Sequence, residues 1–559
     1  MSSAPAGHRG RTTAGATQAG GTPGPAGPAA SPAPGGSRRA ALAGLWAAIA
    51  AVAATMAVLG WWGLARRNSM GNDEVATRWA ALLPLRDLFH LLRHLDAVHG
   101  LYYLLMHPWA AVGSSPATLR IPSVVAMMAA GALTVILARQ LTGSVRTGLF
   151  AGLVMVLTPS VSFYAQTARS YAMVLACVVG TTMALVAALR AEAAGLASVR
   201  RWAGYAVLVA LGAYLNEMSL LVLAAHAVTV LLARPGQPVI KRWLTAAIAG
   251  TVLAFPVLLL SLIQHGAIGW IGYPSWPGIR LLLEDYFGTT AVAVVLLAVC
   301  VIVAVLPPRE AWPERLGGQP GTAAALPWWR GSGVSLPSVA VPLLVLPALL
   351  LIIESYVLHP LFVDRYVLYG EAGAALLAGA GADRIGRWLS GAAGHRWGRS
   401  GGGWRALAWL PGLVLCAGLL VSQLGPQHAI RTPGSRAYDF GGPSRYIGAN
   451  AHQGDGILFF GTLYRKAELG YPADFANTTD FAMALSPLRA GNFRGTDKPF
   501  PLAGPLMLHY QRIWVVGLRP SRKIPPGPLR DESIELFRDF TLAGIRHFRG
   551  ITVTLWVRR

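Results

Sequence analysis

Charged side chains are scarce in this sequence of 559 residues: Asp, Glu, Lys and Arg make up 13% of it, against 54% hydrophobic residues. That proportion excludes an ordinary soluble protein, because a soluble surface needs more polar side chains to cover it. Cysteine is almost absent as well. Cys177, Cys300 and Cys416 all lie inside apolar segments without zinc-like spacing, so neither a disulfide framework nor a structural zinc site is expected.

Gly-rich phosphate loops are also missing, so a soluble nucleotide-sugar or ATP site has no support. The chain has no Asp-x-Asp motif, and its two histidines nearest the polar cluster described below, His99 and His107, are eight residues apart. We therefore expect no metal ion and no other cofactor.

Basic residues dominate the small charged fraction: 47 Lys and Arg against 24 Asp and Glu give a net charge of +23. They are spread over short loops and termini rather than gathered in a recognition module, so nucleic acid is not the predicted partner. Cytoplasmic loops of membrane proteins carry such an excess. The predicted class is a polytopic α-helical membrane protein.

Eleven apolar stretches are predicted to cross a bilayer as helices, which takes roughly 20 residues each. They are Ala41–Leu64 and 122–140, 147–165, 170–190, 202–215, 217–233, 243–263, 289–306, 338–357, 366–382 and 405–424. An alternative makes 202–233 one long tilted helix broken near Asn216-Glu217. That alternative would place the Arg-rich loops downstream on the outer side, so two spans are preferred.

The two ends of the chain differ from this middle part. Residues 1–41 are rich in Gly, Pro, Ala, Ser and Thr, with four arginines and no acid, which predicts a disordered cytoplasmic tail. Eleven spans then place the C-terminus outside the cell membrane. Residues 425–559 have the composition of a small soluble α/β domain, with predicted strands Gly456–Phe460, Ile513–Val516 and Ile551–Val557 and a predicted helix Asp531–Phe540.

The polar residues between the first two spans form the main candidate site. The outer loop 65–121 opens with the acid pair Asp73-Glu74, and Asp87 to Val112 has the apolar spacing of one interfacial helix. Neighbouring helical residues point about 100° apart, so one acid would react and the other would position it. The alternative is a solvated acid pair that stabilises a helix N-terminus after Asn72.

Two arginines at outer ends of spans, Arg169 and Arg365, run against the usual distribution of positive charge. A guanidinium binds phosphate through paired hydrogen bonds, which makes both arginines candidates for a phosphate ligand. Their alternatives are contact with lipid phosphates or, for Arg365, an ion pair with Asp364.

Several short motifs in this order resemble the GT-C glycosyltransferases, and among them the protein O-mannosyltransferase and aminoarabinose-transferase-like branch, family 39. They are Asp73-Glu74, Asp96-x-x-His99-x-x-Tyr102-Tyr103 with Leu104-Leu105 following, Arg120-Ile-Pro-Ser123, Tyr164-x-x-x-x-Arg169-x-Tyr171-Ala172 and Arg365-Tyr366. The resemblance runs from about residue 60 to 380, and residues 425–559 resemble the extracytoplasmic tails of actinobacterial members. Relatives often have a Pro-Pro pair where this chain has Gly100-Leu101, which leaves the role of His99 open.

The resemblance implies transfer of a sugar, with mannose as one candidate, from a polyprenyl-phosphate donor to an extracytoplasmic protein, lipid or cell-wall glycan. It implies a transmembrane catalytic domain over residues 42–424. The residues it points to are Asp73 and Glu74 for catalysis, Arg169, Arg365, Tyr171 and Tyr366 for the donor phosphate, and Asp96, His99, Tyr102 and Tyr103 for the substrate cavity.

Two other function classes compete with the enzyme. A transporter or lipid flippase could use Asp73, Glu217 and the arginines as a binding path, but transporters usually show internal repeats or broken helices at the membrane midplane. No clear repeat is present, and the polar cluster falls on a surface loop. A membrane-anchored scaffold acting through residues 425–559 is the third possibility.

Overall fold

The computed structural model describes residues 34–65, 69–306, 333–397, 404–518 and 530–559. Most of the expected disordered tail, residues 1–33, therefore lies outside the described residues. The chain divides into two compact units, Met1–Ala43 and Gly44–Arg559. The first unit contributes the start of helix α1 (Pro34–Trp61), and the features below belong to the second unit.

Four helices in the described residues are long and apolar enough to cross a membrane: α5 (Pro116–Thr142), α8 (Tyr171–Ala193), α15 (Leu336–Val357) and the part of α1 from Arg39 onward. The number rises to seven if each of three bent helix pairs is one span. These pairs are α6 (Val145–Leu157) with α7 (Pro159–Ala165), α11 (Gln237–Leu253) with α12 (Phe255–Ile263), and α13 (Trp276–Phe287) with α14 (Ala291–Val305), bent by 68°, 52° and 68°. The protein is a multi-pass membrane protein.

Each of the eleven expected spans falls on one of these helices or on a further helix of the described chain. The further helices are α9 (Val199–Leu215), α10 (Val222–Ala233), α16 (Glu371–Trp397), α17 (Trp404–Leu407) and α18 (Leu410–Ser422). Stretch 202–233 is two helices. Asn216 between them has extended backbone, and its side chain accepts a hydrogen bond from Met218 N at the start of η2 (Glu217–Leu221).

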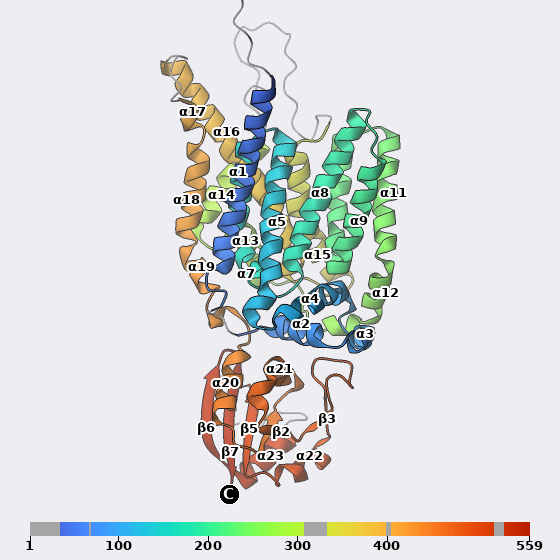
Figure 1. The fold of residues 1–559 in the computed structure, drawn as a ribbon, viewed down its shortest axis with the longest axis vertical. Helices are drawn as coiled ribbons and strands as arrows, with labels where there is room; N and C mark the ends of the chain where they lie inside the picture. The colour runs from blue at the N-terminus through green and yellow to red at the C-terminus, as the bar shows by residue number, and fades with distance from the viewer. Residues whose placement is uncertain (1–33, 66–68, 307–332, 398–403, 519–529) are drawn as a thin grey trace, which may run out of the picture. The chain divides into compact units, whose positions relative to one another are not determined.

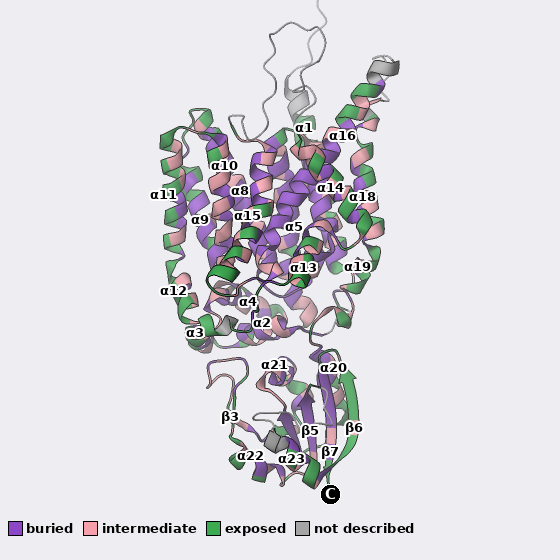
Figure 2. Ribbon diagram, turned by 180° about the vertical axis from the view of Figure 1, so that it is seen from behind, coloured by how far each residue is buried: buried purple, intermediate pink, exposed green. Residues whose placement is uncertain are grey.

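Close packing of these helices depends on small residues. A Cβ on Gly379 of α16 would lie 2.5 Å from the backbone nitrogen of Ala151 on α6, and one on Gly381 would overlap the carbonyl of Cys300 on α14. Small residues let helices in a membrane approach closely. Most residues of α8 are buried and few of α5 are exposed, whereas α11 and α18 expose much of their surface (Figure 2).

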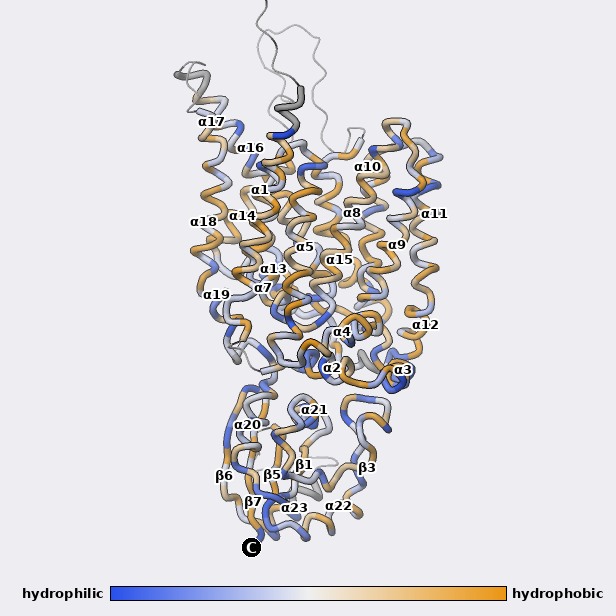
Figure 3. The backbone as a smooth tube through the Cα atoms, in the orientation of Figure 1, coloured by the Kyte–Doolittle hydropathy of each residue, from blue (hydrophilic) through white to orange (hydrophobic). Residues whose placement is uncertain are grey.

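The loop between α1 and α5 folds into four helical pieces at one end of these helices (Figure 1). They are α2 (Asn72–Leu82), α3 (Leu85–His94), η1 (Ala97–His99) and α4 (Gly100–Val112). Hydrophilic residues gather along α2 and α3, whereas α5, α8, α14 and α15 are predominantly hydrophobic (Figure 3).

The single helix predicted for Asp87 to Val112 is wrong. The chain leaves α3 through an extended Leu95, and Asp96 has a left-handed backbone with φ of 61°. Aspartate adopts that conformation more readily than most residues. The turn redirects the chain, so that α4 and η1 bring Tyr103 and His99 back beside Asp96.

Residues 425–559 form a mixed sheet with helices on it. The strand order is β2-β1-β5-β7-β6, with β1 parallel to β2 and β5, and β7 antiparallel to β5 and β6. The elements of this part are α19 (Leu424–Ala429), α20 (Gly441–Asn450), β1 (Asp455–Phe459), α21 (Lys466–Gly470), β2 (Thr478–Asp480), β3 (Met483–Leu485), β4 (Thr496–Asp497), α22 (Phe500–Met507), β5 (Arg512–Gly517), α23 (Arg530–Asp539), β6 (Phe540–Phe548) and β7 (Ile551–Arg558).

The three predicted strands correspond to β1, β5 and β7, and the predicted helix corresponds to α23. Strand β6 was not predicted. It is one of the two edge strands of the sheet, and six of its nine residues are exposed, so it lacks the run of buried side chains by which a central strand is recognised in sequence.

Candidate active site

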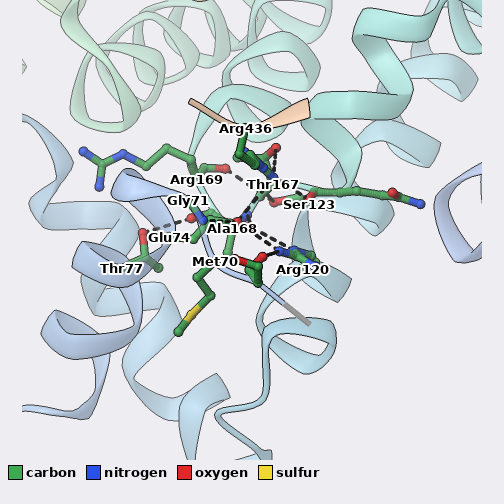
Figure 4. A network of polar contacts seen from close by, with 12 residues as sticks. Met70, Gly71, Glu74, Thr77, Arg120, Ser123, Thr167, Ala168, Arg169 and Arg436 are labelled. Carbon is green, nitrogen blue, oxygen red and sulfur yellow. Dashed lines mark hydrogen bonds and ion pairs between the residues drawn. The ribbon is translucent and has the colours of Figure 1, made fainter. Parts of the chain in front are cut away.

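Glu74 is the most highly bonded carboxylate in the loop (Figure 4). Its oxygens accept hydrogen bonds from Gly71 N at 3.0 Å and Ala168 N at 3.0 Å. Arg120, near the start of α5, donates from Nε at 2.8 Å and from Nη2 at 3.0 Å, and Arg436 Nη2 lies 3.3 Å away. The bond to Gly71 closes a capping box at the start of α2.

This environment keeps Glu74 ionised. Burial opposes ionisation, but the guanidiniums of Arg120 and Arg436 outweigh it and hold the pKa of Glu74 well below its usual range. With 1% of its surface exposed, Glu74 offers no free oxygen to a substrate. Its contacts join α2, α5, the α7–α8 connection and the segment before α20, and of the two roles predicted for the acid pair they favour that of the positioning carboxylate for Glu74.

Asp73 lies one residue earlier in α2 and has a different environment. It is half-buried, and within the described residues its carboxylate forms no ion pair. The nearest side-chain donor is Asn72 Nδ2, at 3.4 Å from Oδ1. Burial opposes ionisation of Asp73, but the positive charges of Arg169, Arg365 and Lys466 lower its pKa to about 2. Both acids are thus ionised, and Asp73 is the accessible member of the pair.

Arg169 reaches the same space from the α7–α8 connection. Its Nη1 donates to Tyr103 OH at 2.6 Å, and its Nη2 lies 3.3 Å from Asp96 Oδ2. Tyr103 OH in turn donates to Asp96 Oδ2 at 2.6 Å. Figure 4 shows the guanidinium of Arg169 directed away from Arg120. Arg169 is 5% exposed, and its Nε has no hydrogen-bond partner within the described chain.

His99 lies beside this triad in η1. Burial, with a smaller contribution from Arg169, lowers the pKa of His99 to about 3, so the imidazole is neutral. Its Nδ1 is buried and, among the residues described, has no hydrogen-bond partner. Tyr102, the last member of the predicted substrate cavity, is fully buried with its ring 6.3 Å from that of Tyr103.

Arg365 comes from a third part of the chain, η5 (Asp364–Gly370). Its Nε donates to Tyr171 OH at 3.0 Å, and its guanidinium lies over the rings of Trp270 at 5.6 Å and Tyr366 at 5.8 Å. In the part of the chain that the structure describes, Arg365 forms no ion pair, so the alternative of a bond to Asp364 does not hold.

The segment after Gly425 also contributes to this site, which the sequence did not indicate. Lys466 Nζ on α21 donates to Asn72 Oδ1 at 2.8 Å, and Met70 N donates to Tyr471 OH at 2.8 Å. Met70 and Val75 are buried in one hydrophobic core with residues of β1, β5 and β7. The local sequence around Lys466, Tyr464-Arg-Lys-Ala467, carries no signal of these contacts.

Metal-binding groups are not apparent in the described ranges: no three His, Cys, Asp or Glu side chains gather in a way that could hold an ion. His107 Nδ1 lies 3.0 Å from the carbonyl of Ala81. His90 and His94, a pair four residues apart on α3, were not included in the sequence argument against a metal; both are exposed, and their rings lie 4.7 Å apart.

The ten residues predicted for the site thus come together from α2, the α3–η1 turn, η1, α4, the α7–α8 connection, the start of α8 and η5. Arg120, Arg436, Asn72 and Lys466 join them; none of the four was predicted as a site residue, although Arg120 belongs to one of the motifs quoted above. The fold that carries this arrangement is the GT-C fold of multi-pass membrane proteins, with an added α/β region at the C-terminus.

Comparison with solved structures supports that fold. The chain matches ArnT from Cupriavidus metallidurans in the apo state with a TM-score of 0.55 and 12% identity, over 91% of this chain and 97% of ArnT. The same protein bound to undecaprenyl phosphate gives a TM-score of 0.53 at 12% identity, over the same shares of both chains.

The archaeal oligosaccharyltransferase AglB from Archaeoglobus fulgidus, in complex with an inhibitory peptide and a dolichol-phosphate, gives a TM-score of 0.46 at 11% identity, over 86% of this chain and 69% of AglB. No family model and no curated sequence matches the chain.

Proposed function

We propose that this protein is an inverting glycosyltransferase that moves a sugar from a polyprenyl-phosphate donor to an acceptor hydroxyl. The observation that carries the proposal is the position of Asp73. It is the one carboxylate of the acid pair with a free oxygen, and the positive charges of Arg169 and Arg365 keep it ionised, as a group that accepts a proton must be. A base beside two guanidiniums suits a reaction in which a proton leaves an acceptor while charge collects on a phosphate.

The reaction balances with these groups alone. The acceptor oxygen attacks the anomeric carbon from the face opposite the phosphate, which inverts that carbon. The hydroxyl proton passes to Asp73 as the new glycosidic bond forms. The bond between the anomeric carbon and the phosphate oxygen breaks, and its electron pair stays on that oxygen. Arg169 and Arg365 stabilise the added negative charge.

ArnT in complex with undecaprenyl phosphate supports a polyprenyl-phosphate donor for this chain too, since the two proteins share a fold over most of their lengths. We further propose membership of family 39, mannose as a candidate sugar, and a protein, lipid or cell-wall glycan as acceptor. The site would face outward from the cell membrane, with the N-terminus cytoplasmic. Residues 42–424 would form the catalytic domain and 425–559 an extracytoplasmic domain.

The test is sugar transfer in membranes from a panel of labelled polyprenyl-phosphate sugars. Wild-type protein should transfer from at least one donor, and Asp73→Asn should lower the rate about 10²–10⁴-fold, the usual contribution of a positioned base. Asp87→Asn, at a partly exposed position of α3 in the same loop, is the matched control and should transfer normally. Transfer by Asp73→Asn at the wild-type rate would refute the base assignment.

A lipid flippase is the second candidate, because three helix pairs are sharply bent, as is common in transporters. An assay in reconstituted vesicles distinguishes the two functions. A flippase would move labelled polyprenyl phosphate between leaflets without cleaving any glycosidic bond, whereas the proposed enzyme would release polyprenyl phosphate and glycosylate an acceptor.

A further inference from the structure

Lys466 has an unusual environment for a lysine. It is 6% exposed, yet within the described residues it forms no ion pair, and Asn72 Oδ1 is the one hydrogen-bond acceptor of its Nζ. An ammonium has three N–H donors and is costly to bury unless it is paired. Two donors therefore remain for another partner. Its other close neighbour is the ring of Phe493, 5.3 Å away.

The charges that face Lys466 come from several elements. The strongest are Asp73 on α2 and Asp96 after α3, which favour its charged form, and Arg494 and Arg169, which oppose it. Glu468 lies on the same short helix, and neighbouring Arg465 is bound by Asp480 and Asp497. Neither Asp73 nor Asp96 lies within 4.0 Å of Nζ, so no carboxylate of the described chain neutralises it directly.

Three cations thus approach Asp73 from three parts of the chain: Arg169, Arg365 and Lys466. None forms an ion pair with it, although all three influence its charge. Arg169 is held by Asp96 and Tyr103, and Arg365 by Tyr171. Cations held apart around one carboxylate leave a positive environment that suits an anion between them.

We propose that Lys466 binds the phosphate group of the lipid donor, so that the C-terminal region supplies the third cation of the donor site. This inference rests on the proposed function and extends it. The ammonium acts as a point charge with two free donors, while Arg169 and Arg365 supply planar guanidiniums. As the sugar leaves, the phosphate gains a negative charge, and a third cation stabilises that charge.

The protonation of Lys466 gives the proposal a readout that a purely structural lysine lacks. Burial lowers the pKa of Lys466 to about 8, although Asp73 and Asp96 oppose the change. Its charge is therefore present at pH 7 and largely lost at pH 9.5. Arginine stays protonated over that range, so Lys466→Arg should retain the charge throughout.

The experiment measures binding of undecaprenyl phosphate to the purified full-length protein in detergent at pH 7 and pH 9.5. Wild-type affinity should fall several-fold at the higher pH. Lys466→Met should bind about tenfold more weakly at pH 7, as expected for one charged hydrogen bond. Lys466→Arg should bind well at both pH values. Lys498→Met is the matched control, because Lys498 donates to the carbonyl of Phe481 in the same region.

The outcomes separate this inference from the proposed function. Unchanged binding by Lys466→Met, or a pH effect that persists in Lys466→Arg, would overturn the inference while the function stands. If wild-type protein neither binds undecaprenyl phosphate nor transfers a sugar, the proposed donor class fails and the inference fails with it. Thermal unfolding of each variant confirms that the compared proteins are folded.

Discussion

Arg120 Nε lies 2.8 Å from Glu74 Oε1, in an ion pair whose two side chains are almost completely inaccessible. Glu74 belongs to the loop after the first membrane helix, and Arg120 belongs to the start of α5. The same carboxylate also forms an ion pair with Arg436, which follows the last apolar helix in the sequence. With the hydrogen bond from Ala168 N, one buried carboxylate therefore joins four separate chain segments beside Asp73.

We predict that Glu74→Gln strongly destabilises the protein. The substitution leaves two buried guanidiniums without a counter-charge, which typically costs about 3–5 kcal/mol. Thermal or denaturant unfolding in detergent measures the loss. Glu284→Gln is the control, since Glu284 pairs with the exposed Arg280 at 2.7 Å and such surface pairs contribute about 0–1 kcal/mol. Equal stability of the two variants would show that the buried pair is dispensable.

Replacing Arg365 should raise the KM for the lipid donor while changing the stability of the protein little. Its guanidinium donates to Tyr171 OH and stacks near three aromatic rings, without any ion pair among the described residues. Arg365→Met should raise KM for the lipid donor about tenfold, with Arg365→Lys in between. Arg280→Met, an exposed arginine of α13, serves as control. A normal KM in Arg365→Met would remove Arg365 from the donor site.

His99 should make the protein less stable as the pH falls. Its folded-state pKa of about 3, lowered by burial and then by Arg169, lies below the unfolded value of 6.5. Below pH 6.5 the unfolded chain therefore binds a proton that the folded protein does not, and stability is lost as the pH falls. At pH 5 this amounts to about 2 kcal/mol.

Melting temperatures at pH 7.5 and pH 5 test this prediction. His99→Gln should lose less stability than wild type between these values, whereas His509→Gln, at an exposed position in the C-terminal region, should behave like wild type. An equal loss in His99→Gln and wild type would mean that His99 binds its proton in the folded state as well.

Gly381→Leu should disrupt the packing of α16 on α14. Any Cβ at this position overlaps the carbonyl of Cys300, and a backbone atom of a packed helix has little freedom to move. We expect loss of the monodisperse peak in size-exclusion chromatography. Gly391→Leu lies on the same helix with nothing within 4 Å of its Cβ and should elute normally. Normal elution of both would contradict the close approach of the two helices.

The membrane helices were predictable because the length and apolar composition of each segment are enough to identify it as a span, without knowledge of its contacts. Each expected span falls on a helix, and the break at Asn216 agrees with the charge distribution in the loops. Arg169 and Arg365 could also be found, because a positive charge at the outer end of a span is rare enough to need a reason. Their partners Tyr103 and Tyr171 then followed from the motifs that contain them.

Contacts between distant segments could not be predicted in this way. Lys466 and Asn72 are 394 residues apart, and nothing in either local sequence indicates the other. The left-handed backbone of Asp96 was missed for a similar reason. The local apolar spacing favours a continuous helix, and the turn is stabilised by Tyr103 and Arg169, which reach Asp96 only in the folded protein.

The contacts of Arg436 and Lys466 have a consequence for how the protein is made. Synthesis proceeds from the N-terminus, so α2 leaves the ribosome long before either basic residue exists. Until the C-terminal region has been translated and folded, Glu74 has only Arg120 as a charged partner, and Met70 and Val75 lack the strands that bury them. The surroundings of Asp73 are therefore completed last, so a truncated or stalled chain could insert its helices without acquiring the site.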